Sequence, residues 1–264
     1  MTRDRTELWL PLLRELTDKH PGWAIWKNVD SAFEGTGDVD SFAPPEDWDA
    51  IQATFVEWAR SNGLGPVLVC RHVPQGPHFI TLQQDSPYLV QLDVKQRGTF
   101  RGSTLIDAST LLPLTEIDPS GFRRIRPGAE AVIKLCMNGI RKGGLPNDEG
   151  LRTKNVAKLL ASDVDGVLSA SHLLGPARLA LLRGATALLK GGWDRPAMAT
   201  VEAWCAARAL AEPRVAASRW WFLNVVAKRC GVIDLIRDHD RRIEGDPAAW
   251  LRAIAADHEL IHTS

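Results

Sequence analysis

The chain of 264 residues carries no formal net charge and has an ordinary globular composition, 45% hydrophobic and 24% charged, which argues against long disordered stretches. Its four cysteines, Cys70, Cys136, Cys205 and Cys230, are far apart in the sequence, which argues against a zinc knuckle and a disulfide framework. A polar start and the lack of an apolar run of about 18 residues predict a cytoplasmic protein with no membrane partner.

The N-terminal part alternates helical and strand-like segments. Leu8 and Leu12 recur at helical spacing and predict a helix over 6–19. An apolar run predicts a buried strand over 23–26. A loop that contains glycines separates it from a second strand, over 38–42, which two prolines end.

The pattern continues with an amphipathic helix over 45–62, in which Phe55 and Trp58 share one face. Three apolar runs, divided by turns that contain Pro or Gly, then predict strands over 67–73, 78–83 and 88–94.

From residue 128 onward the pattern is helical. Helices are expected over 128–142, 153–162, 176–190, 197–211, 214–230 and 247–260. The sequence therefore predicts an α+β fold, with a mixed-sheet α/β lobe over 1–127 followed by an all-α lobe over 128–264.

Three carboxylates of the first lobe point to chemistry. Residues two apart on a strand share a face, so Asp38 and Asp40 would present neighbouring carboxylates, a pair that a divalent cation would neutralise. Asp93 lies in an apolar strand, where an isolated aspartate is costly to bury unless it is paired or binds a metal. The alternatives are a polar strand edge or turn for the pair, and for Asp93 an exposed strand end bonded to a turn, to Lys95 or to Arg97.

The order of these elements resembles the polymerase-β-type nucleotidyltransferase superfamily: helix, strand, glycine-containing loop, Asp-x-Asp strand, helix, strands, then a single Asp on a strand. The resemblance covers residues 20–95, and more weakly the helices that follow. It implies that Asp38, Asp40 and Asp93 are catalytic and bind two Mg²⁺ or Mn²⁺ ions. It also implies that a nucleoside monophosphate moves from an NTP such as ATP to an acceptor hydroxyl or phosphate, with release of pyrophosphate.

The sequence departs from the superfamily upstream of the carboxylate pair. Where the family has Gly followed by Gly or Ser in contact with phosphate, this chain has Lys27 and Asn28. Lys27 would bring a point charge to the phosphates, or else it is a solvated lysine after a strand. The close approach of the loop to the nucleotide would fall to its small residues, Ser31, Gly35, Thr36 and Gly37.

The second lobe is rich in cations, and related two-lobed enzymes hold phosphates with such residues. Lys154 and Lys158 would lie one turn apart on a helix and are assigned to nucleotide binding. Most of the basic series is expected to be solvated surface; it comprises Arg97, Arg101, Arg123, Arg124, Arg126, Lys134, Arg141, Lys142, Arg152, Lys154 and Lys158. His72 and His78 receive no role, because two histidines without further ligands are more often structural.

Three functions follow from this pattern. A nucleotidyltransferase acting on a small molecule is favoured, and the alternatives are a toxin-like enzyme acting on tRNA or protein and a degenerate nucleotide-binding module without catalysis. The three carboxylates are expected to converge in an open cleft, with pKa values raised by mutual repulsion or with a bound cation. Replacing one of them by asparagine is then expected to leave stability equal or slightly higher.

Overall fold

The structure is a computed structural model, and it describes residues 4–27, 29–35, 37–71, 76–83, 89–147, 150–221 and 259–262. The described residues group into two compact units, drawn from 1–96, 117–124 and 219–264 for unit 1 and from 97–116 and 125–218 for unit 2. The division into domains 1–127 and 128–264 stays a prediction. No helix in the described part combines the length and the apolar character needed to cross a bilayer.

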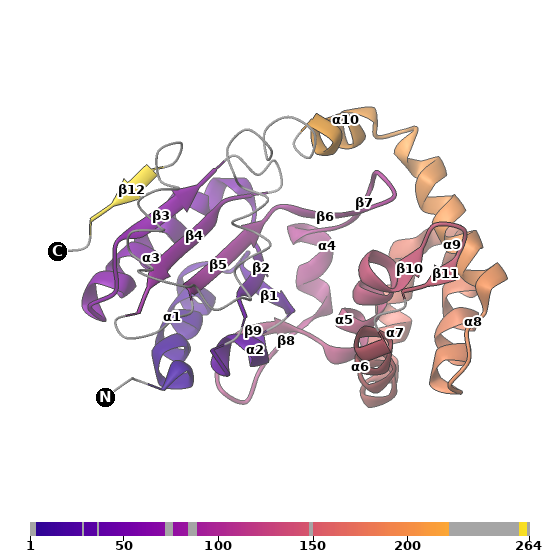
Figure 1. The fold of residues 1–264 in the computed structure, drawn as a ribbon, viewed down its shortest axis with the longest axis horizontal. Coiled ribbons are helices and arrows are strands. Elements are labelled where there is room, and N and C mark those ends of the chain that lie inside the picture. The colour runs from indigo at the N-terminus through magenta and orange to yellow at the C-terminus, as the bar shows by residue number, and fades with distance from the viewer. Residues whose placement is uncertain are drawn as a thin grey trace. The chain divides into compact units, whose positions relative to one another are not determined.

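Unit 1 is built around a mixed β-sheet (Figure 1). Its first elements are α1 (Arg5–Lys19), β1 (Ala24–Lys27), α2 (Val29–Phe33), β2 (Val39–Phe42), η1 (Pro45–Asp47), α3 (Trp48–Ser61), β3 (Val67–Cys70), β4 (His78–Leu82) and β5 (Leu89–Lys95). The sheet also includes β8 (Thr115–Ile117), β9 (Arg123–Ile125) and β12 (Glu259–Ile261).

The eight strands of the sheet lie in the order β12-β3-β4-β5-β2-β1-β9-β8. Strand β2 runs parallel to β5, and β1 runs parallel to β9, whereas β1–β2, β3–β4, β4–β5 and β3–β12 are antiparallel. The mixed sheet and the mainly helical region that follows it confirm the predicted α+β class. The prediction of an all-α lobe over 128–264 is wrong in detail, because a two-stranded hairpin over 140–146 and strand β12 lie in this range. That the sheet is nucleotidyltransferase-like stays a prediction.

One face of the sheet packs on helices α1 and α3 and forms the core of unit 1. The rings of Phe55 of α3 and Phe79 of β4 lie 5.7 Å apart, and Phe79 pairs across the strands with Leu92 of β5. Neighbouring residues on a strand point to opposite faces. His78 and Asp93, which adjoin Phe79 and Leu92, therefore point to the face away from these helices.

Unit 2 combines two β-hairpins with helices (Figure 1). Its elements are β6 (Arg97–Phe100), β7 (Ser103–Asp107), α4 (Ala108–Leu111), η2 (Leu112–Leu114), α5 (Pro127–Lys134), the π-helical turn η3 (Leu135–Gly139), β10 (Ile140–Arg141), β11 (Leu145–Pro146), α6 (Gly150–Ser162), α7 (Val164–Ser171), η4 (His172–Ala177), α8 (Arg178–Leu189), α9 (Arg195–Ala209) and α10 (Pro213–Trp221).

Helix α5 packs against α6 and α7, and Asp163 fixes this contact. Its carboxylate accepts hydrogen bonds from the backbone N–H of Gly128 and of Gly166, and it pairs with Arg126 at 2.6 Å. A Cβ atom on Gly128 would lie 2.0 Å from the carbonyl oxygen of Asp163, so only glycine allows the two helices to approach this closely.

Two predicted elements need correction, and one further helix was not predicted. The helix expected over 128–142 consists of α5 and η3 and stops at Gly139, where strand β10 of a hairpin follows. Helix α7 was not predicted, although Asp163 caps it by accepting a hydrogen bond from Gly166. Of the helix expected over 247–260, residues 247–258 lie outside the described residues, and the last two belong to strand β12. This short strand forms by pairing with the edge of β3, which local periodicity does not reveal.

Candidate functional site

Four polar residues lie opposite one another across four adjacent strands. The register pairs Lys27 of β1 with Asp40 of β2, Asp40 with Asp93 of β5, and Asp93 with His78 of β4. Directly opposed residues share a face and bring their side chains together. We call these four residues the ionic row, which joins β1 and β2 to β4 and β5, two strands that come only after α3 and β3 in the sequence.

A β-bulge directs Lys27 into the row. Ile25 pairs with Ser41 and Lys27 pairs with Asp40, so Trp26 is the extra residue on β1. Bulges bend a strand and re-aim its side chains. As a result, Nζ of Lys27 lies 4.8 Å from the ring centroid of Trp26 and 3.0 Å from Oδ2 of Asp40.

The three aspartates singled out in the sequence meet at this place. One oxygen each of Asp38, Asp40 and Asp93 lies within 4.8 Å of the others. Their residues are only 4%, 1% and 3% exposed, respectively. The expectation that the carboxylates line an open cleft is therefore wrong for the described conformation, because all three are buried.

Lys95 brings a second ammonium group to the cluster. It follows Asp93 by two residues on β5 and so shares its face. Its Nζ lies 2.5 Å from Oδ1 of Asp40 and 3.4 Å from Oδ2 of Asp93. The pairing of Asp93 with Lys95, considered as an alternative to metal binding, is thus present in the structure.

The side chains of His78 and Gln91 also form hydrogen bonds with the carboxylate of Asp93. Nδ1 of His78 hydrogen-bonds Oδ1 of Asp93, and Nε2 of Gln91 donates to the same oxygen at 2.8 Å. The Ser41 hydroxyl donates to the Asp93 carbonyl oxygen at 2.7 Å and ties β2 to β5. The bonds from His78 and Gln91 fix the orientation of the Asp93 side chain, and the bond from Ser41 holds its backbone.

The expected rise in the pKa values of the carboxylates is wrong for Asp40 and Asp93. Burial alone would raise the pKa of Asp40, but Lys27 and Lys95 outweigh it and hold this pKa below its ordinary value. Burial is likewise outweighed at Asp93, whose pKa is lowered by His78 and Lys95. The pKa of Lys95 is raised, since the two aspartates outweigh the effect of its burial.

Lys95, His78 and Gln91 were not predicted as site residues. A signal for two of them was present, because Gln91, Asp93 and Lys95 alternate with apolar residues along β5 and so share a face. His78 had no comparable signal. Its place opposite Asp93 depends on the pairing of β4 with β5, which is a tertiary contact.

The other residues predicted for nucleotide binding are placed as follows. Lys27 forms an ion pair with Asp40 and is largely buried, so it is not the solvated lysine that was considered as an alternative. Asn28 and Thr36 lie outside the described residues. Ser31 lies on the short helix α2, and a Cβ atom on Gly37 would lie 2.7 Å from the Cβ of Ser31, so the loop closes tightly at this glycine.

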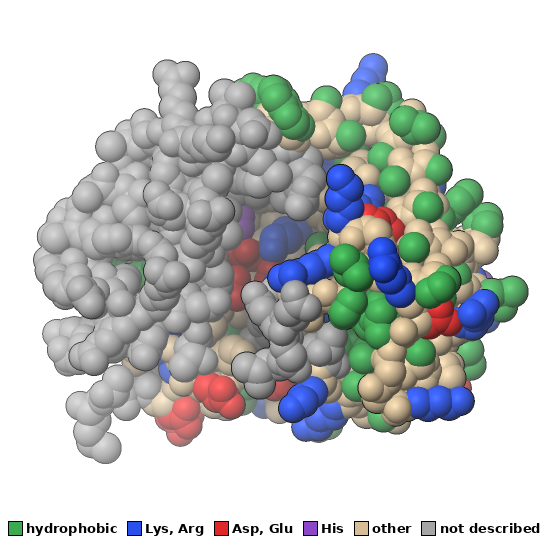
Figure 2. Space-filling view, turned by 45° about the vertical axis from the view of Figure 1, so that its right-hand side comes forward, with side chains coloured by type: hydrophobic (Ala, Val, Ile, Leu, Met, Phe, Trp, Pro, Cys, Tyr) green, Lys and Arg blue, Asp and Glu red, His purple; other side chains and the backbone are tan. Residues whose placement is uncertain are grey.

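Lys154 and Lys158 lie on α6 of unit 2, and both side chains are exposed. Their spacing of four residues confirms that they lie one helical turn apart. Figure 2 shows Lys and Arg side chains dispersed among hydrophobic ones over the described part of the visible surface. The expectation that most of the basic series is solvated holds only in part. Arg141, Lys142, Lys154 and Lys158 are exposed. Arg124, Arg126 and Lys134 are half-buried and pair with Asp118, Asp163 and Glu130.

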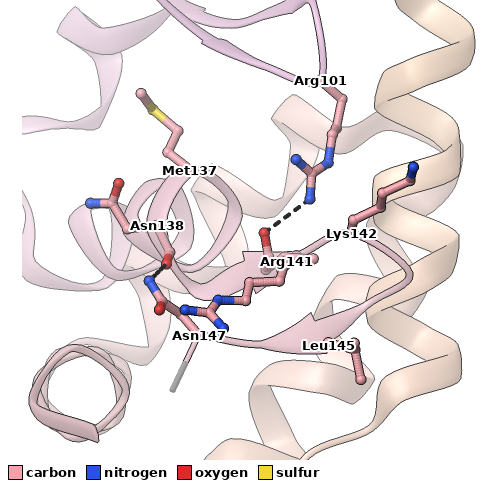
Figure 3. A pocket seen from close by; sticks show the side chains of 8 residues that line it. Arg101, Met137, Asn138, Arg141, Lys142, Leu145 and Asn147 are labelled. Carbon is pink, nitrogen blue, oxygen red and sulfur yellow. Dashed lines mark hydrogen bonds between the residues drawn. The ribbon is translucent and has the colours of Figure 1, made fainter. Parts of the chain in front are cut away.

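Unit 2 also contains an open pocket of about 520 Å³ (Figure 3). It is lined by Arg101, Met137, Asn138, Ile140, Arg141, Lys142, Leu145 and Asn147. The guanidinium of Arg101 is engaged, because its Nε lies 2.8 Å from Glu202 and its Nη2 donates to the Ile140 carbonyl oxygen at 3.2 Å. The pocket therefore combines basic and amide side chains.

The chemistry of the aspartate cluster suits a hard divalent cation. Mg²⁺ and Mn²⁺ prefer oxygen ligands, and three carboxylates supply them from two neighbouring strand regions. The ammonium of Lys95 between Asp40 and Asp93 shows that the cluster accommodates positive charge at this position. Comparisons of the chain with models of protein families, with curated proteins and with solved structures found no match.

Proposed function

We propose that this chain is a metal-dependent nucleotidyltransferase, which moves a nucleoside monophosphate from an NTP to an acceptor hydroxyl or phosphate and releases pyrophosphate. The observation that carries the proposal is the meeting of Asp38, Asp40 and Asp93, whose oxygens lie within 4.8 Å of one another. Phosphoryl transfer requires mainly positioning and neutralisation of charge. Three carboxylates beside two lysines supply both signs of charge at one place.

In this function the acidic residues of the site would bind the metal and the basic residues would bind the phosphates. The three aspartates would hold Mg²⁺ or Mn²⁺, which when bound neutralises the triphosphate and the leaving pyrophosphate. Lys27 and Lys95 would contact phosphate oxygens as point charges once the nucleotide draws them from Asp40. His78 and Gln91 act as positioning residues, because both bond the same oxygen of Asp93.

The ion pairs also support one alternative, a nucleotide-binding module without catalysis. Lys27 and Lys95 neutralise Asp40 without any metal, and burial restricts access to the cluster. A small-molecule acceptor stays favoured over tRNA, because the chain has no net charge and long RNA helices select basic surfaces.

The function is tested by incubating the full chain with each labelled NTP, Mg²⁺ or Mn²⁺ and a cell extract, while labelled product and pyrophosphate are measured. Thermal unfolding under the same conditions reports binding. A nucleotide at a hundredfold excess over its Kd is expected to stabilise the fold by about 2.7 kcal/mol.

The variants Asp93→Asn and Asp49→Asn provide the matched comparison. The first removes a carboxylate of the cluster, and the second removes one whose side chain on α3 is 90% exposed. Transfer is expected to be lost in Asp93→Asn, with folding checked by circular dichroism, and kept in Asp49→Asn. Binding without transfer would favour the non-catalytic module. Melting curves unchanged by every NTP with either metal would refute both.

A further inference from the structure

The ammonium group of Lys95 bridges two carboxylates of the site. Its Nζ lies 2.5 Å from Oδ1 of Asp40 and 3.4 Å from Oδ2 of Asp93. The side chain of Lys95 is 20% exposed, and those of the two aspartates are 2% and 4% exposed. A lysine side chain placed between two carboxylates is an ammonium ion at neutral pH.

The oxygens that a divalent cation would need are already engaged. Lys27 contacts Oδ2 of Asp40, while His78 and Gln91 contact Oδ1 of Asp93. Mg²⁺ binds oxygen at about 2.0–2.1 Å and demands a near-octahedral set of ligands. A cation between Asp40 and Asp93 would therefore compete for the same oxygens as the ammonium and would be repelled by it.

We propose that Lys95 is a built-in cation of this site, which takes the place between Asp40 and Asp93 that a divalent cation would otherwise occupy. The inference rests on the proposed metal site. It follows that, without nucleotide, the wild-type protein binds at most one divalent cation at the aspartates. Removing the ammonium group opens a further place.

The test counts Mn²⁺ bound to the full chain without nucleotide, by electron paramagnetic resonance of the free ion during titration. Lys95→Met removes the charge and keeps an unbranched side chain. This variant is expected to bind one Mn²⁺ more than the wild type, and its melting temperature is expected to rise more on adding Mn²⁺. Lys27→Met is the matched control, since it also removes an ammonium from Asp40, and it is expected to gain no ion. Lys95→Arg keeps the charge and is expected to behave as the wild type.

Each outcome decides the inference. Equal numbers of bound Mn²⁺ in the wild type and in Lys95→Met overturn it, as does an equal gain in Lys27→Met. A Lys95→Met chain that folds only with Mn²⁺ supports it, whereas one that stays unfolded with Mn²⁺ overturns it. Two bound ions in an active wild type overturn the inference and leave the function standing. A gain in Lys95→Met together with no NTP binding refutes the function alone.

Discussion

In the substitution Asp40→Asn the side chain keeps its size and loses its charge, while Lys27 and Lys95 keep theirs. Both lysines contact Asp40, at 3.0 and 2.5 Å. The pKa of Asp40 lies below its ordinary value although burial and the charge of Asp93 both act to raise it. The surroundings as a whole therefore favour the carboxylate, and its removal is expected to destabilise the protein.

The magnitude follows from the burial of the pair. The side chain of Asp40 is 2% exposed and those of both lysines are 20% exposed. The two ion pairs of Asp40 are therefore much more buried than an ion pair on the protein surface. Exposed ion pairs contribute about 0.2–1 kcal/mol, whereas breaking a buried pair costs about 3–5 kcal/mol. Since the two lysines keep some access to water, we expect the free energy of unfolding of Asp40→Asn to fall by about 3 kcal/mol, the lower end of the range for a buried ion pair.

The assay is urea unfolding at neutral pH with a chelator, so that metal binding does not contribute. The midpoint is expected to fall without a change in the slope, because the surface exposed on unfolding stays the same. Asp49→Asn is the control, since Asp49 pairs with Arg71 at 2.7 Å but its side chain is 90% exposed, and its loss is expected to stay below about 1 kcal/mol. An Asp40→Asn variant as stable as the wild type would show that repulsion among the carboxylates dominates, as the sequence alone suggests.

Two further predictions concern unit 2. Gly128→Ala is expected to cost about 1–3 kcal/mol in thermal unfolding, because its Cβ would lie 2.0 and 2.6 Å from backbone atoms of Asp163 and Val167. Gly192→Ala, whose Cβ would lie 3.6 Å from its nearest neighbour, is expected to stay within about 0.5 kcal/mol, and similar losses in both would contradict the close packing of α5 on α7. Burial acts to raise the pKa of Asp163, but hydrogen bonds from backbone N–H groups and from Arg126 outweigh it and lower this pKa. Below the unfolded pKa of about 3.9 the unfolded chain therefore binds more protons, so the stabilisation is complete above about pH 5 and is lost as the pH falls through the folded pKa. Asp163→Asn is expected to weaken this acid dependence in unfolding curves measured from pH 6 downward, and an unchanged dependence would exclude Asp163 as a contributor.

The sequence by itself determined which residues share a face. The period of two along a strand depends only on neighbouring residues, so it predicted that Asp38 and Asp40 share a face. The apolar run around Asp93 likewise marked this residue as a single buried carboxylate. Helices α1 and α3 followed from the spacing of their apolar residues for the same local reason. The short elements α7 and β12 were missed, because one depends on a single capping residue and the other on pairing with a distant edge.

Only the tertiary structure decided that β2 and β5 are neighbours, although β3 and β4 lie between them in the sequence. The register that sets Asp40 between Lys27 and Asp93, and Asp93 beside His78, is a property of the whole sheet, since a slip of one residue would turn a side chain to the other face. The protonation of the cluster was decided in the same way. A pattern of three aspartates predicts repulsion and raised pKa values, whereas the folded sheet brings Lys27 and Lys95 against Asp40, so that attraction between opposite charges exceeds both repulsion and the cost of burial.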